Sequence, residues 1–346
     1  NQNLATLELF HGPTMAFKDV GGRFMARCLG YFNRTATEKV TVLVATSGDT
    51  GGAVASGFLG VPGVEVIILY PKGKVSHIQE LQLTTQGQNI KALEVDGVFD
   101  DCQDMVKTAF LDETLKPHRN LTSANSINVA RWLPQSFYYF FAVQELMKRK
   151  VNNPFVFSVP SGNFGNICAG FIARELGLPI SHFIASTNQN DTFPRYMENG
   201  IFEPKPSVQT ISNAMDVGNP SNFDRISKLF NQDLYRLKNV CSSYYFSDKE
   251  TKTAMKDLYE NFSYISDPHG AVGYLGLQKY CENNPEVYGV FLETAHPVKF
   301  LDVVEKAIKT KVSIPPQIEE IMGRNSEKTS ISSYRELKNF LIDNAI

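Results

Sequence analysis

Apolar runs alternate with stretches of helical periodicity along most of this chain. Continuous apolar segments of strand length occur at residues 40–45, 64–70, 90–95, 155–159, 182–185 and 287–292. Helix signals fill the gaps, and the capping box at residues 247–250 predicts a helix that runs to about Phe262. Continuously apolar strands separated by helices are typical of parallel sheets covered on both faces. The pattern therefore predicts an α/β fold with mostly parallel sheets.

The same pattern suggests two lobes. We expect a smaller α/β lobe over residues 22–130 and a larger one over residues 131–346, on which residues 1–21 pack. Residues 125–150 form a long aromatic-rich segment of helical character, in which Pro134 should break or kink the helix.

Composition and charge exclude several classes of function. The formal net charge of −2 gives no global field that favours nucleic acid or an anionic membrane. No apolar run approaches the roughly 20 residues of a membrane span. The five cysteines are widely spaced without a C-x-x-C motif, so we expect free thiols and a cytoplasmic location. The six histidines lack metal-ligand spacing, so we expect no structural metal.

Three strands lead into polar or glycine-rich turns at residues 46–52, 160–166 and 293–297. Open parallel sheets bind ligands beyond the carboxyl ends of their strands, so these turns are candidate binding loops. The turn at Ser161–Asn166 opens a helix, and its glycines allow N–H groups to converge on an anion. An ordinary tight turn explains this segment equally well. The loop at residues 46–52 suits a carboxylate, but its small polar residues also suit a helix N-cap.

Lys18 lies among apolar residues at the start of a helix predicted to reach Phe32. Both surroundings disfavour the ammonium form, and a neutral amine is what a Schiff base requires. A lysine on a helix surface, or one held charged by Asp19, is the ordinary alternative.

In combination, these segments resemble the threonine synthase family, which belongs to the fold type II (tryptophan-synthase-β) superfamily of pyridoxal-phosphate (PLP) enzymes. The matching segments extend from about residue 7 to about residue 300. They are HGPTMAFKD (11–19), ATSGDTGGA (45–53), SANSIN (123–128) with Arg131, PSGNFGN (160–166), DPHGAVGY (267–274) and ETAHPVKF (293–300).

The resemblance implies a role for each matching residue. Lys18 would form the Schiff base with PLP, and Thr294 would contact the pyridine nitrogen. The cofactor phosphate would be held by Gly162, Asn163, Phe164, Gly165 and Asn166. The substrate would be held by a loop of Ser47, Gly48, Asp49 and Thr50, in which the role of Asp49 stays open, and by a phosphate-binding set of Asn125, Ser126 and Arg131.

The implied reaction converts O-phospho-L-homoserine and water into L-threonine and phosphate by β,γ-replacement, a lyase activity of amino-acid biosynthesis. Three alternatives stay open: another fold type II enzyme such as a dehydratase or cysteine synthase, a phospho-lyase that releases 2-oxobutyrate, and an inactive fragment. The last arises because only 17 residues precede Lys18, where family members carry a further N-terminal region. Oligomeric state is left open. We expect His11 and His269 to order loops, and His296 to steady the turn at Thr294.

Overall fold

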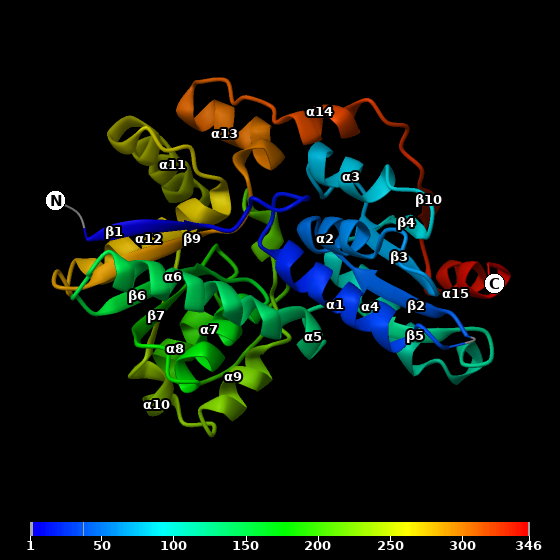
Figure 1. Ribbon diagram of the computed structural model, residues 1–346, viewed down its shortest axis with the longest axis horizontal. Coiled ribbons are helices and arrows are strands. Elements are labelled where there is room, and N and C mark those ends of the chain that lie inside the picture. The colour runs from blue at the N-terminus through cyan, green and yellow to red at the C-terminus, as the bar shows by residue number, and fades with distance from the viewer. Residues whose placement is uncertain (1–2, 37, 345–346) are drawn as a thin grey trace. The chain divides into compact units, whose positions relative to one another are not determined.

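The computed structural model of the chain describes residues 3–36 and 38–344, and these form two compact units (Figure 1). The first unit combines the segment up to His11 with Trp132–Ser313, and the second combines Gly12–Arg131 with the segment from Ile314 onward. Each unit has one five-stranded sheet in which every pairing is parallel. The α/β fold with parallel sheets is therefore confirmed. Within the described residues, no helix has the length and apolarity needed to cross a bilayer.

The sheet of the first unit has the strand order β1-β9-β6-β7-β8. Its strands are β1 (Leu4–Glu8), β6 (Phe155–Pro160), β7 (Ile180–Thr187), β8 (Cys241–Tyr245) and β9 (Tyr288–Glu293). Its helices are α6 (Ser136–Lys148), α7 (Gly165–Glu175), α8 (Thr192–Asn199), α9 (Phe223–Leu229), α10 (Leu234–Lys238), α11 (Asp248–Phe262), α12 (Pro268–Cys281) and α13 (Leu301–Ile308), with short 3-10 turns η2 (Leu133–Gln135), η3 (Asn213–Met215) and η4 (Pro297–Phe300).

Alternate residues of the central strands of this sheet feed two different cores. Val156 and Ile184 face the core formed with α11, α12 and α13. Their neighbours Phe157 and Phe183 point the other way, where the Tyr139 ring of α6 contacts both at centroid distances of 5.5 and 5.9 Å. Because both faces are covered, the strands are apolar throughout, which explains their clear signal in the sequence.

The sheet of the second unit has the strand order β10-β4-β3-β2-β5. Its strands are β2 (Val40–Ala45), β3 (Val64–Pro71), β4 (Ile90–Val95), β5 (Asn120–Ser123) and β10 (Thr329–Ile331). Its helices are α1 (Lys18–Phe32), α2 (Asp49–Phe58), α3 (His77–Thr84), α4 (Phe99–Leu111), α14 (Pro316–Met322) and α15 (Tyr334–Asp343), with the 3-10 turn η1 (Glu113–Leu115); α5 (Val129–Trp132) begins in this unit and ends at the boundary.

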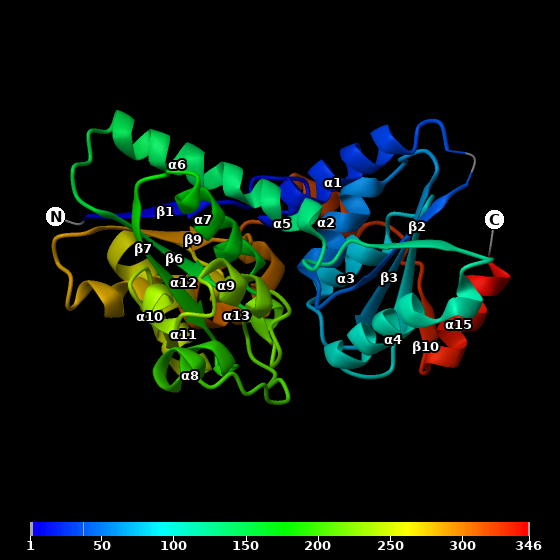
Figure 2. The same ribbon diagram turned by 90° about the horizontal axis from the view of Figure 1, so that it is seen from below.

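The second sheet is also covered on both faces, with α1, α2 and α3 on one side and α4 and α15 on the other (Figure 2). Along β2, Val42 and Val44 face the first group of helices, whereas Leu43 and Ala45 face the second. The last helix, α15, contributes Leu337 to the second core.

Residues 12–21 and 314–344 group with the second unit, instead of the larger lobe in which we expected them. The C-terminal segment joins the second unit because β10 pairs with β4 and α15 packs on α4. Within residues 125–150, the helix is interrupted by the 3-10 turn Leu133–Gln135, as Pro134 predicts. The helix of the capping box ends at Phe262, as predicted.

Candidate active site

The predicted site residues form two groups, one in each unit. Gly162–Asn166 and Thr294 lie in the first unit, at the carboxyl ends of β6 and β9. Lys18, Ser47–Thr50, Asn125, Ser126 and Arg131 lie in the second unit. Apart from Arg131, which lies within α5, the predicted residues follow the carboxyl ends of parallel strands or begin a helix, which is where this fold class binds ligands.

The turn after β6 has the geometry of an anion-binding site at the start of α7. Phe164 adopts a left-handed conformation with φ of 61°, so the chain reverses there and enters the helix at Gly165. The helix has no side-chain cap at this end, which leaves its first N–H groups to a ligand. The Phe164 ring packs on Phe193 at 4.5 Å, and this contact holds a backbone conformation that a bulky residue rarely adopts.

The side-chain amide of Asn166 has a fixed orientation at this turn. The hydroxyls of Tyr138 and Tyr139 both donate to its Oδ1, at 2.6 and 2.7 Å. These two bonds fix which end of the amide is the acceptor. The Nδ2 donor is buried and has no partner among the described residues. An orphaned donor beside free helix N–H groups fits the phosphate of PLP, because a buried donor normally requires an acceptor.

A second loop, which contains Ser221 and Asn222, hydrogen-bonds to this turn. Ser221 donates from both its N–H and its hydroxyl to Asn163 Oδ1, at 2.6 and 2.8 Å, and Asn222 donates to the Asn163 carbonyl at 2.8 Å. The close packing of this turn against the second loop also requires glycine at position 162, since a Cβ there would lie 2.6 Å from Met215 Cα. The segment around Ser212–Asn222 is therefore part of the candidate site, although no role was predicted for it.

Asp216 holds the supporting loop in place. Its carboxylate accepts from Thr210 N–H and hydroxyl at 2.9 and 2.7 Å and from Asn188 Nδ2 at 2.9 Å. Burial raises the pKa of Asp216 to about 7, against these hydrogen bonds. Asn188 directly follows β7, within the polar run STNQN at residues 186–190. The strand-end reasoning used for three other turns, applied also to β7, would have found this one.

Thr294 follows β9 and is buried, with 5% of its surface exposed. The turn beyond it is closed by His296, whose Nδ1 accepts from the Val298 N–H at 3.1 Å. His269 orders a loop as well, because its Nε2 accepts from the Ala214 N–H at 3.2 Å. Both histidines therefore take the ordering roles expected of them. His11 contacts Glu8 Oε2 at 2.8 Å on the surface.

Lys18 is the first residue of α1 and is partly buried, with its Nζ 5.5 Å from the centroid of the Phe17 ring. Asp19 accepts from the N–H and hydroxyl of Thr14 at 2.9 and 2.5 Å. Gly12 leaves room for this carboxylate, since a Cβ there would lie 2.3 Å from Asp19 Oδ2. The acidic neighbour of Lys18 thus has a structural task in the motif.

In the loop at residues 46–52, the N–H groups at the start of α2 are capped by Thr46, and not by the hydroxyls of Ser47 and Thr50 that are predicted to bind substrate. Thr46 Oγ1 accepts from Gly48 N–H at 2.9 Å and from Gly51 N–H at 2.8 Å. The Ser47 and Thr50 side chains are partly buried and make no hydrogen bond within residues 3–36 and 38–344. Thr46 therefore takes the capping role, which leaves the other two hydroxyls available to a ligand.

Asp49 is 3% exposed and accepts from Gln79 Nε2 at 2.9 Å. The same Gln79 side chain crosses Gly48, where a Cβ would lie 2.4 Å away and φ is 131°. Only glycine combines that conformation with so close a neighbour. Asp49 and Gln79 together fix the shape of the loop, which assigns Asp49 a supporting role that its sequence position left open.

Asn125 and Arg131 are engaged with the main chain of their own unit. The Asn125 amide accepts from Ala45 N–H and donates to Ala45 C=O, at 3.2 and 2.7 Å. Arg131 Nε donates to the Ala124 carbonyl at 2.8 Å. Burial lowers the pKa of Arg131 to about 10, partly offset by the charge of Asp19. Ser126, between them, is partly buried.

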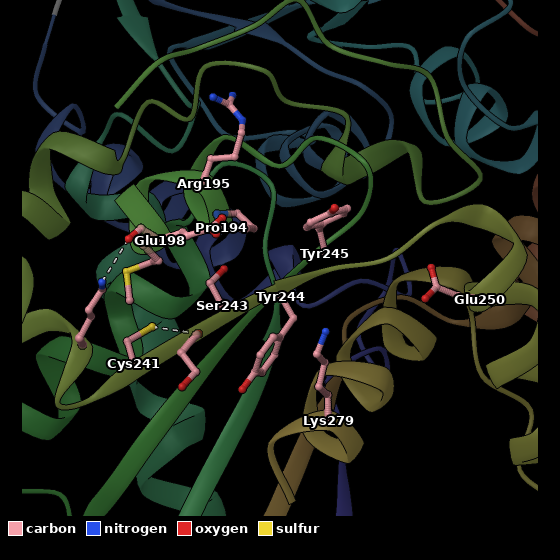
Figure 3. Close-up of a pocket in the computed structure, with 12 residues that line it drawn as sticks. Pro194, Arg195, Glu198, Cys241, Ser243, Tyr244, Tyr245, Glu250 and Lys279 are labelled. Atoms are coloured by element: carbon pink, nitrogen blue, oxygen red, sulfur yellow. Dashed lines mark hydrogen bonds between the residues drawn. The ribbon is translucent and has the colours of Figure 1, made fainter. Parts of the chain in front are cut away.

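A separate pocket of about 700 Å³ lies at the edge strand β8, and none of the predicted site residues lines it. It includes Arg195, Tyr244 and Lys279, with Lys279 Nζ 5.1 Å from the centroid of the Tyr244 ring (Figure 3). Its charged side chains are of both signs, so it presents no uniform electrostatic preference for one class of ligand.

Comparison with known proteins shows the family of the chain. A family model described as "Pyridoxal-phosphate dependent enzyme" matches residues 4–290, and one described as "Threonine synthase, C-terminal" matches residues 270–341. A threonine synthase of Buchnera aphidicola subsp. Acyrthosiphon pisum is 46% identical over 343 residues, which cover 99% of this chain and 79% of the relative.

Two solved structures share the fold over nearly the whole chain. The crystal structure of threonine synthase from Escherichia coli has a TM-score of 0.93 and 44% identity, and covers 99% of this chain and 79% of that one. The PLP-bound threonine synthase from Brucella melitensis has a TM-score of 0.90 and 34% identity, and covers 100% of this chain and 79% of that one.

Proposed function

Because this chain belongs to the threonine synthase family of PLP-dependent enzymes, we propose that it converts O-phospho-L-homoserine and water into L-threonine and phosphate. The cofactor of this family is PLP, which supplies an electron sink for carbanion chemistry when bound. We assign the phosphate of PLP to the turn Gly162–Asn166. The observation that carries this assignment is the buried Nδ2 of Asn166, which has no partner among the described residues, while two tyrosine hydroxyls donate to Oδ1 of the same amide.

The remaining cofactor contacts are assigned to Lys18 and Thr294. Lys18 Nζ would link PLP covalently and, once displaced by the substrate amine, would move the proton at the substrate Cα. Its place at the start of α1 favours the neutral amine that both tasks require, because the helix dipole disfavours a cation there. Thr294 would offer a hydroxyl instead of a carboxylate to the ring nitrogen, which would leave that nitrogen less protonated.

The substrate contacts are assigned to the second unit. The hydroxyls of Ser47 and Thr50 and the first N–H groups of α2 suit the substrate carboxylate. Arg131, with Ser126, suits the phosphate, because a planar guanidinium can donate to a phosphate group through two parallel hydrogen bonds. Asn125 supports the end of β2 and would act on the substrate through that strand.

The test is to supply PLP and O-phospho-L-homoserine and to assay threonine, 2-oxobutyrate and phosphate together. Threonine and phosphate in equal amounts would support the proposal. Release of 2-oxobutyrate with phosphate would instead identify a phospho-lyase, and no product from a PLP-loaded chain would identify an inactive fragment. We also propose a cytoplasmic location, because all five cysteines are free thiols.

A further inference from the structure

Two carboxyl groups lie buried together behind Thr294, where β9 and α12 run side by side (Figures 1 and 2). Glu293 and Asp267 are each 0% exposed, and their side chains are in hydrogen-bonding contact. Glu293 Oε2 and Asp267 Oδ2 have no other partner among the described residues. Two ionised carboxylates at this depth would repel each other, whereas one proton between the two oxygens satisfies both.

The surrounding hydrogen bonds identify which carboxyl holds the proton. Asp267 Oδ1 accepts from the His269 N–H at 2.7 Å and lies 2.6 Å from His269 Nδ1. Since His269 Nε2 accepts from the Ala214 N–H, the imidazole proton is on Nδ1 and is donated to Asp267. Asp267 Oδ1 thus accepts two hydrogen bonds, which favours placing the shared proton on Glu293. Burial, followed by the charge of Asp267, raises the pKa of Glu293 well above its usual range.

We propose that the neutral Glu293 carboxylic acid is a positioning residue for PLP, which links the ring end of the cofactor site to its phosphate end. Glu293 immediately precedes Thr294, and its proton is shared with Asp267, which orients His269. His269 in turn holds Ala214, whose carbonyl lies 3.2 Å from where a Cβ of Gly162 would be. The inference rests on the proposed placement of PLP at Thr294 and at Gly162–Asn166.

Gly270 makes room for the buried carboxyl pair. A Cβ at Gly270 would lie 2.2 Å from the Glu293 carboxyl, so the first turn of α12 accepts this carboxyl only because residue 270 has no side chain. Ser266 completes the site by donating from its hydroxyl to Glu293 Oε1 at 2.6 Å. Every polar atom of Glu293 is thus provided with a partner once Oε2 carries a proton.

The proton can be observed without turnover or cofactor, by infrared spectroscopy of the full chain. We expect the carbonyl band of a protonated carboxyl at about pH 8, above the pKa of about 7 of Asp216, which is the other buried carboxyl group with a raised pKa among the described residues. The band should be lost in Glu293→Gln and kept in the control Asp216→Asn. Absence of the band from the unmodified chain, or its survival in Glu293→Gln, would overturn the proposal.

The positioning role is tested by fluorescence titration with PLP. Glu293→Gln should bind PLP almost as tightly as the unmodified chain, because its amide donates where the acid proton did and accepts from Ser266. Glu293→Ala should bind about tenfold more weakly, since it orphans a buried acceptor. Equal weakening in both variants, or none in folded Glu293→Ala, would overturn the role. Failure of the PLP placement itself is distinguished by Gly162→Leu, which would then bind PLP normally.

Discussion

Arg131 donates from Nη1 to the main-chain carbonyl of Lys18 at 3.1 Å. The residue proposed to read the substrate phosphate therefore also holds the first residue of α1, which carries the proposed cofactor link. Gly21 and Gly22 permit this approach, since a Cβ at either position would lie within 3.3 Å of Arg131 atoms. A substitution at Arg131 should consequently disturb both substrate recognition and the start of α1.

Arg131→Leu is expected to lower kcat/KM for O-phospho-L-homoserine by on the order of 30-fold to several-thousand-fold, as is typical when a buried anion loses a charged donor. The melting temperature should fall as well, because the Ala124 and Lys18 carbonyls lose their donor. Arg131→Lys keeps the charge and should recover only part of both losses. Near-normal kcat/KM in folded Arg131→Leu would show that the phosphate is read elsewhere.

Lys18→Ala is expected to abolish turnover and the visible absorbance of the lysine–PLP linkage, since no other amine is proposed for that linkage. Borohydride reduction and peptide mapping of the unmodified chain should place the pyridoxyl group on Lys18. Recovery of the label on a different lysine would refute the assignment. Lys72→Ala, a substitution of a lysine with no proposed role, serves as the matched control.

Gly162→Leu is expected to weaken PLP binding by about tenfold or more, because the new side chain would meet the backbone at Met215 and overpacking against a fixed backbone is costly. Fluorescence titration gives the affinity. Gly323→Ala is a suitable control, since its nearest neighbour, the Glu320 carbonyl, is 3.8 Å from the added Cβ. Unchanged affinity in folded Gly162→Leu would remove the phosphate from this turn.

Asn166→Asp is expected to weaken PLP binding by on the order of ten- to a hundredfold, because it replaces the buried donor with a carboxylate facing an anion. The size of the side chain is unchanged, so packing is a minor factor. Tyr138→Phe should have a milder effect, since Tyr139 still donates to Oδ1. Should Asn166→Asp bind PLP as tightly as the unmodified chain, Nδ2 does not contact the phosphate.

The raised pKa of Asp216 makes stability depend on pH with a defined sign. Between about pH 4 and pH 7 the folded chain keeps a proton that the unfolded chain has released, so stability should fall as pH rises through this window. The slope contributed by one such group is at most about 1.4 kcal/mol per pH unit. Asp216→Asn should flatten it in denaturant titrations, and an unchanged slope would assign it to other groups.

The sequence predicted the strands that are buried on both faces and missed the others. Val40–Ala45 is apolar throughout, and β2 has these same bounds. Asn120–Ser123 forms β5 at a sheet edge, where a short polar segment can pair without an apolar signal. β8, at the edge of the other sheet, was missed for the same reason.

The site shows a similar division between local and long-range information. The local sequence predicted that the glycine-rich turn opens a helix, and α7 begins there, whereas the left-handed conformation of Phe164 was not predicted. The support that Asn163 receives from Ser221 comes from 58 residues further along the chain, and no local pattern encodes it. Thr46 was overlooked as the cap because three neighbouring hydroxyls are chemically equivalent in the sequence, and only the backbone geometry distinguishes them.

Both sheets join segments from distant parts of the chain, and this has a consequence for biosynthesis. β1 pairs with β9 at Gly289–Glu293, and β4 pairs with β10 at Thr329–Ile331. During translation, β4 therefore remains an open edge while more than two hundred further residues are synthesised, and unpaired strand edges are sites of aggregation. We expect the nascent chain to depend on chaperones until Ile331 has left the ribosome, and a premature stop after Ser313 to yield insoluble protein instead of a folded second unit.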